Sequence, residues 1–251
     1  HVYDNIDPKR DIEIINTELL LADLEVVEKR FKKLEKQAQT TGQKELKLEV
    51  QVLKVVLDLL KADTPLRSKQ WDREDLQYIL PLNLITLKPI LYICNQSEDA
   101  FKEGNLAEKQ IQEMCRNQEE VLSISCALEE EMVDLNPQEK QEFLSALGMK
   151  EPSLNRVIRK VYEQLNLITF FTAGKKEVKA WTLPKGSLAP QAAGVIHSDF
   201  EKGFIRAEVY SFEDLLKYRT EKDLKQAGRM ISEGKNYEVK DGDIMHFLFN
   251  V

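Results

Sequence analysis

The sequence predicts an α/β protein in three parts: an antiparallel helical hairpin, a parallel strand–helix–strand unit and a small mixed sheet with helices on one face. Three observations support this prediction. Apolar residues recur three and four apart from Asp11 to Leu60. Two short apolar runs then each end in a polar loop. From Asn166 onward the apolar pattern becomes that of strands.

Composition limits the class of protein. The 251 residues are 42% apolar, which suffices for the cores of two or three domains. No apolar run approaches the roughly 18 residues of a membrane span, and no leader pattern opens the sequence, so we expect neither secretion nor membrane contact. Three cysteines without a C-x-x-C pair and three scattered histidines exclude a disulfide framework and a structural zinc site.

Charge is unevenly distributed along the chain. The net charge is -7, so we expect no DNA partner and only local contact with any nucleic acid. Residues 166–251 hold 13 Lys and Arg against 12 Asp and Glu, a net charge of +1, which leaves 23 against 31, or -8, for residues 1–165. This shift coincides with the change in apolar pattern and predicts a domain boundary near Asn166.

The first part is predicted to be two helices. One spans about 11–38, and after a break at Thr40-Thr41-Gly42-Gln43 the second runs to Leu60. Helices joined by so short a turn pack antiparallel. Many Lys and Glu residues cover the faces away from the seam. These faces are either a solvated surface or a docking arm for a large partner.

The second part follows a helix and linker over 71–87. Residues 90–94 are predicted to form a strand buried on both faces, followed by a helix at 106–117 and a strand at 121–124. This order predicts a right-handed parallel unit whose polar loops lie on one edge, where such sheets bind ligands. Helices at 138–147 and 152–165 complete this part.

The last part is predicted to be a mixed sheet. Its expected strands are 168–172, 178–183, 204–210 and 244–249, and its expected helices are 212–218 and 221–227. A β-grasp arrangement fits this order.

The candidate binding residues lie in two polar loops. Asn95-Gln96-Ser97-Glu98 has the spacing of the Asn-x-x-Asp loop of guanine-nucleotide-binding proteins, in which the carboxylate accepts from two guanine N–H groups. Adenine lacks that pair of N–H donors. Glu98, in place of the Asp of that loop, is longer by one methylene, which displaces the carboxylate. Ser125-Cys126-Ala127 stands where the same fold has a second base-contacting loop. The alternative is an ordinary pair of polar strand-end loops.

Long peptides along the whole chain resemble the YchF-type Obg-like ATPase family. The matching stretches are His1-Val2, Ile6-Asp7-Pro8, 11–19, 21–25, Leu87-Lys88-Pro89, the Asn95 loop, 171–174, 180–182, 189–194, 196–205 and 240–244. The resemblance implies a P-loop NTPase that prefers ATP with Mg²⁺. It also implies a cytoplasmic protein that binds ribosomes or the large ribosomal subunit.

The resemblance also implies a division of the chain. Residues 1–10 and 85–165 match the C-terminal part of the nucleotide-binding domain, 11–84 an inserted helical arm, and 166–251 a β-grasp TGS domain. Neither a G-x-x-x-x-G-K-[ST] loop nor its Asp-x-x-Gly partner occurs in these residues, and we expect a partial P-loop domain that does not hydrolyse ATP by itself. The alternative to an ATPase is a non-enzymatic module that docks a ribosome, RNA or another protein.

Site residues follow from the same resemblance. The adenine side is assigned to Asn95, the backbone of Gln96, and Glu98, with Ser125, Cys126 and Ala127 as the second loop. His1 matches a family histidine that helps to organise the attacking water, a role that applies only to the full protein.

Other residues suggest further roles. Basic residues at 175, 176, 179, 185, 202 and 206 lie among aromatic ones at 170, 171, 181, 200 and 204, which suits RNA contact, although Trp181 and Phe204 are more typical of a core. His197 beside Asp199 fits a loop-bracing hydrogen bond better than acid–base chemistry. Cys94 and Cys126 are either buried thiols or sensors of oxidation.

Overall fold

The computed structural model describes residues 6–102, 106–115, 119–174 and 177–250. Contacts divide the chain into two compact units, His1–Val157 (unit 1) and Ile158–Val251 (unit 2). This division lies within α8 (Ser153–Gln164), whereas the composition changes near Asn166. Among the described residues, none of the helices combines the length and apolar character that a membrane span needs.

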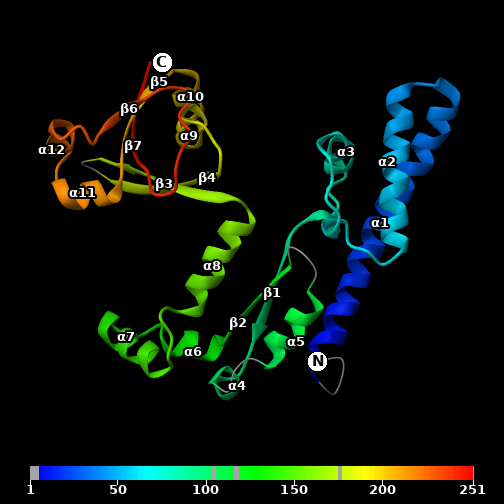
Figure 1. Cartoon of the computed structure of the whole chain (residues 1–251), viewed down its shortest axis with the longest axis horizontal. Coiled ribbons are helices and arrows are strands. Elements are labelled where there is room, and N and C mark those ends of the chain that lie inside the picture. The colour runs from blue at the N-terminus through cyan, green and yellow to red at the C-terminus, as the bar shows by residue number, and fades with distance from the viewer. Residues whose placement is uncertain (1–5, 103–105, 116–118, 175–176, 251) are drawn as a thin grey trace. The chain divides into compact units, whose positions relative to one another are not determined.

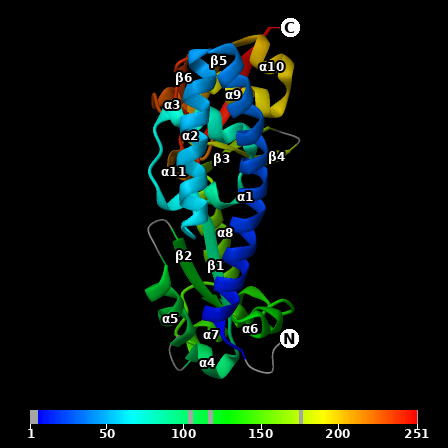
Figure 2. The ribbon, with the colours of Figure 1, turned by 90° about the vertical axis from the view of Figure 1, so that its right-hand side faces the viewer.

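Unit 1 begins with the predicted pair of helices, α1 (Pro8–Thr41) and α2 (Lys44–Lys61), which run side by side (Figure 2). Asp7 caps α1 by accepting a hydrogen bond from the Arg10 main-chain N–H at 3.2 Å. Gly42, with a φ of 66°, ends it in the left-handed conformation. The seam between the helices is built from buried apolar side chains, among them Val27, Leu34, Leu53, Val56 and Leu60.

The chain returns from the hairpin through η1 (Leu66–Ser68). The segment 71–87, expected to be a helix and a linker, contains the helix α3 (Arg73–Ile79) followed by the short turns η2 (Leu80–Leu82) and η3 (Ile85–Leu87). Pro81 and Asn83, whose φ is 51°, prevent a continuous helix. Asp23 of α1 is buried and accepts hydrogen bonds from the main-chain N–H groups of Ile85 at 2.8 Å and Thr86 at 2.7 Å, so it ties the returning segment to the hairpin.

A parallel pair of strands follows. These are β1 (Ile90–Asn95) and β2 (Glu119–Ile124), with α4 (Glu98–Lys102) and α5 (Leu106–Met114) between them. The expectation that the first strand is buried on both faces is wrong. Cys94 is buried with Ile111 of α5, but Ile93 points to the other face and is 47% exposed. Successive side chains of a strand point to opposite faces, and α5 packs against one of them.

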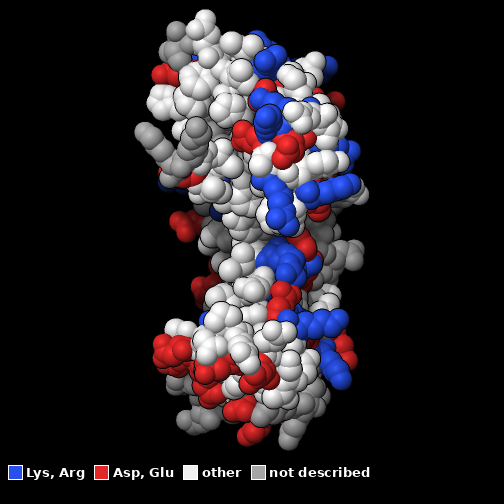
Figure 3. Space-filling model, turned by 90° about the vertical axis from the view of Figure 1, so that its left-hand side faces the viewer, with Lys and Arg blue, Asp and Glu red and all other residues white. Residues whose placement is uncertain are grey.

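Unit 1 continues with α6 (Cys126–Glu131) and α7 (Pro137–Ala146). Asn136 caps α7 by accepting from the main-chain N–H groups of Gln138 and Glu139. On the face shown in Figure 3, acidic side chains gather over α6 and α7, and basic side chains are interspersed with acidic ones on unit 2. The α6–α7 face therefore repels phosphate groups.

Unit 2 contains a five-stranded mixed sheet in the order β4-β3-β7-β5-β6 (Figure 1). The strands are β3 (Leu167–Ala173), β4 (Val178–Pro184), β5 (Phe204–Tyr210), β6 (Ile231–Glu233) and β7 (Ile244–Phe249). The four predicted strands are present. The sequence does not predict β6, because three residues are too few to show an alternating pattern.

Helices contact both faces of this sheet, so the expectation of helices on one face is wrong. The helices are α9 (Ala189–Ile196), α10 (Ser198–Lys202), α11 (Phe212–Tyr218) and α12 (Glu221–Gln226). Phe170 and Phe247 pack with residues of α9, whereas Phe171, the chain neighbour of Phe170, belongs to a second cluster with Tyr210 and with Leu224 of α12. Adjacent strand residues therefore supply two separate cores.

Candidate functional site

The carboxyl ends of β1 and β2 bring the two candidate loops together. Asn95 is the last residue of β1, and its Oδ1 accepts a hydrogen bond from the Cys126 main-chain N–H at 3.1 Å. The Gln96 main-chain N–H donates to the Ile124 carbonyl at 2.9 Å. The loops are thus joined by one side-chain and one main-chain hydrogen bond. Among the described residues, nothing binds the Asn95 Nδ2, which is left to donate to a ligand.

Glu98 is the first residue of α4 and is half-buried. The Ser97 Oγ accepts from the Ala100 main-chain N–H at 3.4 Å and so stabilises the start of that helix. The tetrapeptide therefore places Asn95 at the end of a strand and the Glu98 carboxylate at the start of the next helix, three residues apart on one loop.

Two buried polar atoms at this edge have no hydrogen-bond partner among the described residues. They are the Ser125 Oγ and the Gln96 Oε1. Ser125 is 1% exposed and precedes α6, yet its side chain does not cap that helix. The Gln96 Nε2 donates weakly to the Ser123 Oγ at 3.4 Å, which turns this side chain toward β2. Buried polar atoms are almost always satisfied, so this edge is typical of a site completed by a ligand or water.

The remaining predicted site residues differ in their surroundings. Cys126 and Ala127 are exposed at the start of α6. His1 lies outside the described residues, so its predicted role stays a prediction. Among the described residues, no group of three His, Cys, Asp or Glu side chains lies close enough to hold a metal ion.

Cys94 is a buried thiol at the same edge. Burial raises its pKa and the Glu108 charge raises it further, opposed by a hydrogen bond with Ser123. A raised pKa disfavours the reactive thiolate, which favours the buried-thiol interpretation for Cys94. Cys126, by contrast, is a free cysteine on the surface.

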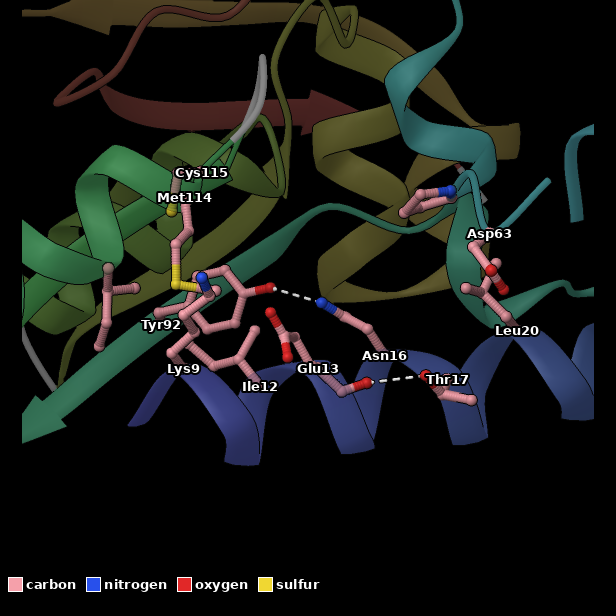
Figure 4. A pocket seen from close by; sticks show the side chains of 12 residues that line it. Lys9, Ile12, Glu13, Asn16, Thr17, Leu20, Asp63, Tyr92, Met114 and Cys115 are labelled. Atoms are coloured by element: carbon pink, nitrogen blue, oxygen red, sulfur yellow. Dashed lines mark hydrogen bonds between the residues drawn. The ribbon is translucent and has the colours of Figure 1, made fainter. Parts of the chain in front are cut away.

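A cavity of about 410 Å³ lies between α1, β1, α5 and the turn after α2 (Figure 4). The Asn16 Nδ2 donates to the Tyr92 hydroxyl at 3.4 Å, and the Arg67 Nη2 donates to the Asn16 Oδ1 at 3.5 Å. Asn16 therefore links the strand that ends in Asn95 to the segment returning from the hairpin. The sequence did not predict this link, because Asn16, Arg67 and Tyr92 are far apart in the chain and belong to no common motif.

In unit 2 the structure assigns local roles to several residues. The His197 Nδ1 accepts from the Asp199 main-chain N–H at 3.2 Å at the start of α10. This contact confirms a loop-bracing role, and the Asp199 carboxylate also lies 3.4 Å from the His197 Nδ1. Phe204 is buried, as expected of a core residue, whereas Trp181 is half-buried. The basic residues at 175 and 176 lie outside the described residues.

A family model matches the C-terminal part of the chain, and curated relatives match the whole of it. Residues 167–250 match the family YchF-GTPase_C, described as a protein of unknown function. The chain is 48% identical to the ribosome-binding ATPase YchF of Haemophilus influenzae over 251 residues, covering 100% of this chain and 69% of that protein. The Bacillus subtilis protein of the same name is 44% identical over 254 residues, with the same coverage.

A solved structure supports the same relationship. The Schizosaccharomyces pombe YchF GTPase is 36% identical and superimposes with a TM-score of 0.87, covering 99% of this chain and 68% of that one. The mixed α/β architecture described above is thus shared with a solved relative. On the identity and coverage of these relatives, the chain belongs to the YchF family.

Proposed function

We propose that the carboxyl edge of β1 and β2 recognises the adenine base of ATP in a translation-associated ATPase. The observation that carries this proposal is the hydrogen bond from the Cys126 N–H to the Asn95 Oδ1, because it holds two base-contacting loops in one geometry. The buried Ser125 Oγ and Gln96 Oε1, which lack partners among the described residues, support a ligand at the same edge.

The choice of base rests on Glu98. Purine N7 is an acceptor common to adenine and guanine, so the Asn95 Nδ2 can serve either base. Adenine has a single amino donor where guanine presents two N–H donors to a carboxylate. The longer Glu98 side chain is displaced by one methylene from the position that suits guanine. A site that leaves polar groups of the wrong base unpaired rejects that base, and we assign the preference for adenine to this residue.

The names of the relatives differ on the nucleotide. The proteins of H. influenzae and B. subtilis are named ATPases, and the S. pombe structure is named a GTPase. We therefore infer the base preference of this chain from Glu98 and not from the names of its relatives.

Hydrolysis requires contacts that the described residues do not supply. No G-x-x-x-x-G-K-[ST] loop occurs among the 251 residues, so the phosphate and Mg²⁺ contacts are assigned to none of them. The proposed share of the chain is base recognition, the helical arm and the C-terminal domain. His1 is proposed to help organise the attacking water in the full protein.

The proposed partner is the ribosome or its large subunit, in the cytoplasm. The H. influenzae and B. subtilis relatives are called ribosome-binding, and the hairpin of α1 and α2 offers a long charged surface for docking. Residues 166–251, proposed to be a TGS domain of β-grasp type, have a net charge of +1 and are proposed to contact RNA. The alternative is a non-enzymatic docking module, for which nucleotide is only a ligand.

Equilibrium titration of the chain with ATP and with GTP tests the base site. We expect ATP to bind more tightly, and Asn95→Ala to weaken ATP binding about tenfold or more, because the loops lose their link. Asn155→Ala is the matched control, since Asn155 is exposed on α8. Tighter binding of GTP, or equal ATP affinity in Asn95→Ala, would refute the proposal.

Co-sedimentation with ribosomes separates the ATPase from the docking module. If the nucleotide state controls docking, the amount of bound protein should differ between ATP and a non-hydrolysable analogue in the full-length protein. Equal amounts with both nucleotides would favour the docking module.

A further inference from the structure

Among the described residues, β4 pairs with β3 alone and is therefore an edge strand of the unit 2 sheet. Two hydrogen bonds, one beyond each end of this pair, fix which residues of β4 bond to β3. The Gly174 N–H donates to the Glu177 carbonyl at 2.9 Å, and the Lys185 N–H donates to the Asn166 carbonyl at 2.7 Å. Bonded and outward-facing residues alternate along an antiparallel strand. The odd-numbered residues of β4 therefore bond to β3, and the even-numbered ones direct their main-chain groups outward.

The open edge of β4 consists of three residues. Val178, Ala180 and Thr182 are exposed, and in the described part of the chain their main-chain N–H and C=O groups have no hydrogen-bond partner. Pro184 is the next even-numbered residue and has no N–H. Its carbonyl already accepts from the Ser187 N–H at 3.2 Å. The edge that can accept another strand thus extends from 178 to 182.

We propose that this edge pairs with the same edge of a second copy of the chain, antiparallel and with Ala180 on the two-fold axis. An open strand edge is a template for another strand, and a two-fold interface uses the same surface of both copies. Ala180 then exchanges both of its bonds with Ala180 of the second copy, and Val178 exchanges both with Thr182 of the second copy. This pairing satisfies every outward N–H and C=O group from 178 to 182.

The side chains favour this register over the two nearest ones. An axis at Lys179 would place two Lys179 side chains directly opposite each other, and like charges in that position repel. An axis at Trp181 would place Val178 opposite Pro184, which has no N–H to donate. With the axis at Ala180, Lys179 lies opposite Trp181 of the second copy. Cation–π attraction favours that pair, as it does within one chain, where the Lys179 Nζ lies 4.0 Å from the Trp181 ring centre.

The other cross-strand pairs of this register are also compatible. Val178 lies opposite Thr182, and pairs of β-branched residues suit a sheet. The small Ala180 side chains meet on the axis. The contact involves few residues of each copy, so we expect a weak dimer that forms at high concentration. This inference uses β4 alone and does not depend on the proposed base site or on ribosome binding.

Sedimentation equilibrium of the full chain tests the pairing. We expect the average mass to rise from that of one chain toward that of two between about 10 μM and about 1 mM protein. Ala180→Pro removes the central N–H and should raise the dissociation constant about tenfold or more. The β3–β4 ladder should persist in this variant, because the Ala180 N–H faces away from β3. Ala180→Ser keeps the N–H and is the matched control.

Two double variants test the register. In Val178→Asp/Thr182→Lys, each new carboxylate lies opposite a new ammonium group of the second copy. In Val178→Lys/Thr182→Lys, two ammonium groups lie opposite each other. We expect the first variant to dimerise at least as tightly as the unchanged chain, and the second about tenfold or more weakly than the first. Circular dichroism checks the fold of every variant, and these two provide the test if Ala180→Pro does not fold.

Three outcomes would overturn the inference. The first is a chain that stays monomeric up to about 1 mM, which would leave this edge to a strand of another protein. The second is a dimer that folded Ala180→Pro does not weaken, because the contact would then lie elsewhere on the chain. The third is equal dimerisation of the two double variants, which would contradict the antiparallel register about Ala180.

Discussion

Asn95 shows how one side chain organises the candidate base site. Its Oδ1 is used within the protein, on the Cys126 N–H, which leaves the Nδ2 for a ligand. The residue therefore holds the second loop, and we propose that it offers a donor to the base at the same time. Glu98, three residues on, is proposed to choose between bases. These two roles predict different results for substitutions at the two positions.

Glu98→Asp should change the base preference. Shortening the side chain by one methylene restores the Asn-x-x-Asp geometry, so the ratio of ATP to GTP affinity should fall about tenfold, toward GTP. Competition between labelled ATP and unlabelled GTP measures this ratio, and Asp99→Glu at an exposed neighbour is the control. An unchanged preference for adenine would contradict our account of Glu98.

Asp23→Ala should destabilise unit 1 by about 2–4 kcal/mol. Asp23 is 2% exposed, and its removal leaves the N–H groups of Ile85 and Thr86 without their acceptor. Glu25→Ala lies on the same helix but is exposed, so it should change the free energy of unfolding by less than about 0.5 kcal/mol. Urea unfolding measures both, and equal effects would show that the Asp23 contacts contribute little.

At this scale the sequence predicted the loop residues but not their bonding. The Asn-x-x-Glu spacing identifies Asn95 and Glu98, because the motif is local in the chain. The contact of Asn95 with Cys126 joins residues on different strands, and the missing partner of Ser125 depends on burial. Neither property can be read from local sequence, and the link through Asn16 has the same cause.

The seam of the helical hairpin is the element whose packing is most directly testable. Leu53 is fully buried between α1 and α2, so Leu53→Ala should cost about 2–5 kcal/mol. Leu48 lies on the same helix but is 44% exposed, and Leu48→Ala should cost less than about 1 kcal/mol. Chemical denaturation followed by circular dichroism measures the two free energies. Similar losses for both variants would contradict the observed seam.

The join between β5 and α12 predicts a pH dependence. Burial, with the nearby Glu221 carboxylate, raises the pKa of Tyr210 from 10.0 to about 12. The folded state therefore favours the neutral phenol, and the stability from this group is complete below pH 10.0 and lost as the pH rises toward about 12. Tyr210→Phe should lose less stability across this interval than the unchanged chain.

Urea midpoints taken across that interval measure the effect. The control variant is Tyr218→Phe, which removes a phenol from the same cluster at a half-buried position. Burial and Asp243 also raise the pKa of Tyr237. The urea midpoint of Tyr210→Phe should therefore still fall with rising pH, but less steeply than that of the unchanged chain. An equal fall of the urea midpoint with pH in Tyr210→Phe and in the unchanged chain would refute this assignment.

Elements with long periodic patterns were predicted well from the sequence. The two helices of the hairpin and four strands of unit 2 carry such patterns, and the structure contains them. The sequence analysis did not find α9, α10 and β6, which are short, and α9 begins at Ala189-Pro190 in an apolar stretch with no clear period. The helices at 212–218 and 221–227 were predicted, but the sheet face that they contact was not, because pairing of faces with helices depends on tertiary packing.

At the scale of the whole molecule, the change in charge and apolar pattern predicts a domain boundary near Asn166, and the contacts divide the chain into two compact units. The acidic residues lie mainly in unit 1, including its α6–α7 face, so this face disfavours contact with a phosphate-bearing macromolecule. The proposed functions divide in the same way, with base recognition by two loops of unit 1 and RNA contact by unit 2. The three-domain division at residues 10, 84 and 165 stays a prediction.

The most direct test of the central claim is a ¹H–¹⁵N NMR titration of the chain with ATP and, separately, with GTP. We expect ATP to shift the main-chain amide signals of Gln96, Glu98 and Cys126, and the side-chain amide signal of Asn95, at lower concentration than GTP does. Shifts at these positions by GTP first, or ATP shifts that spare all four residues, would contradict adenine recognition at this edge.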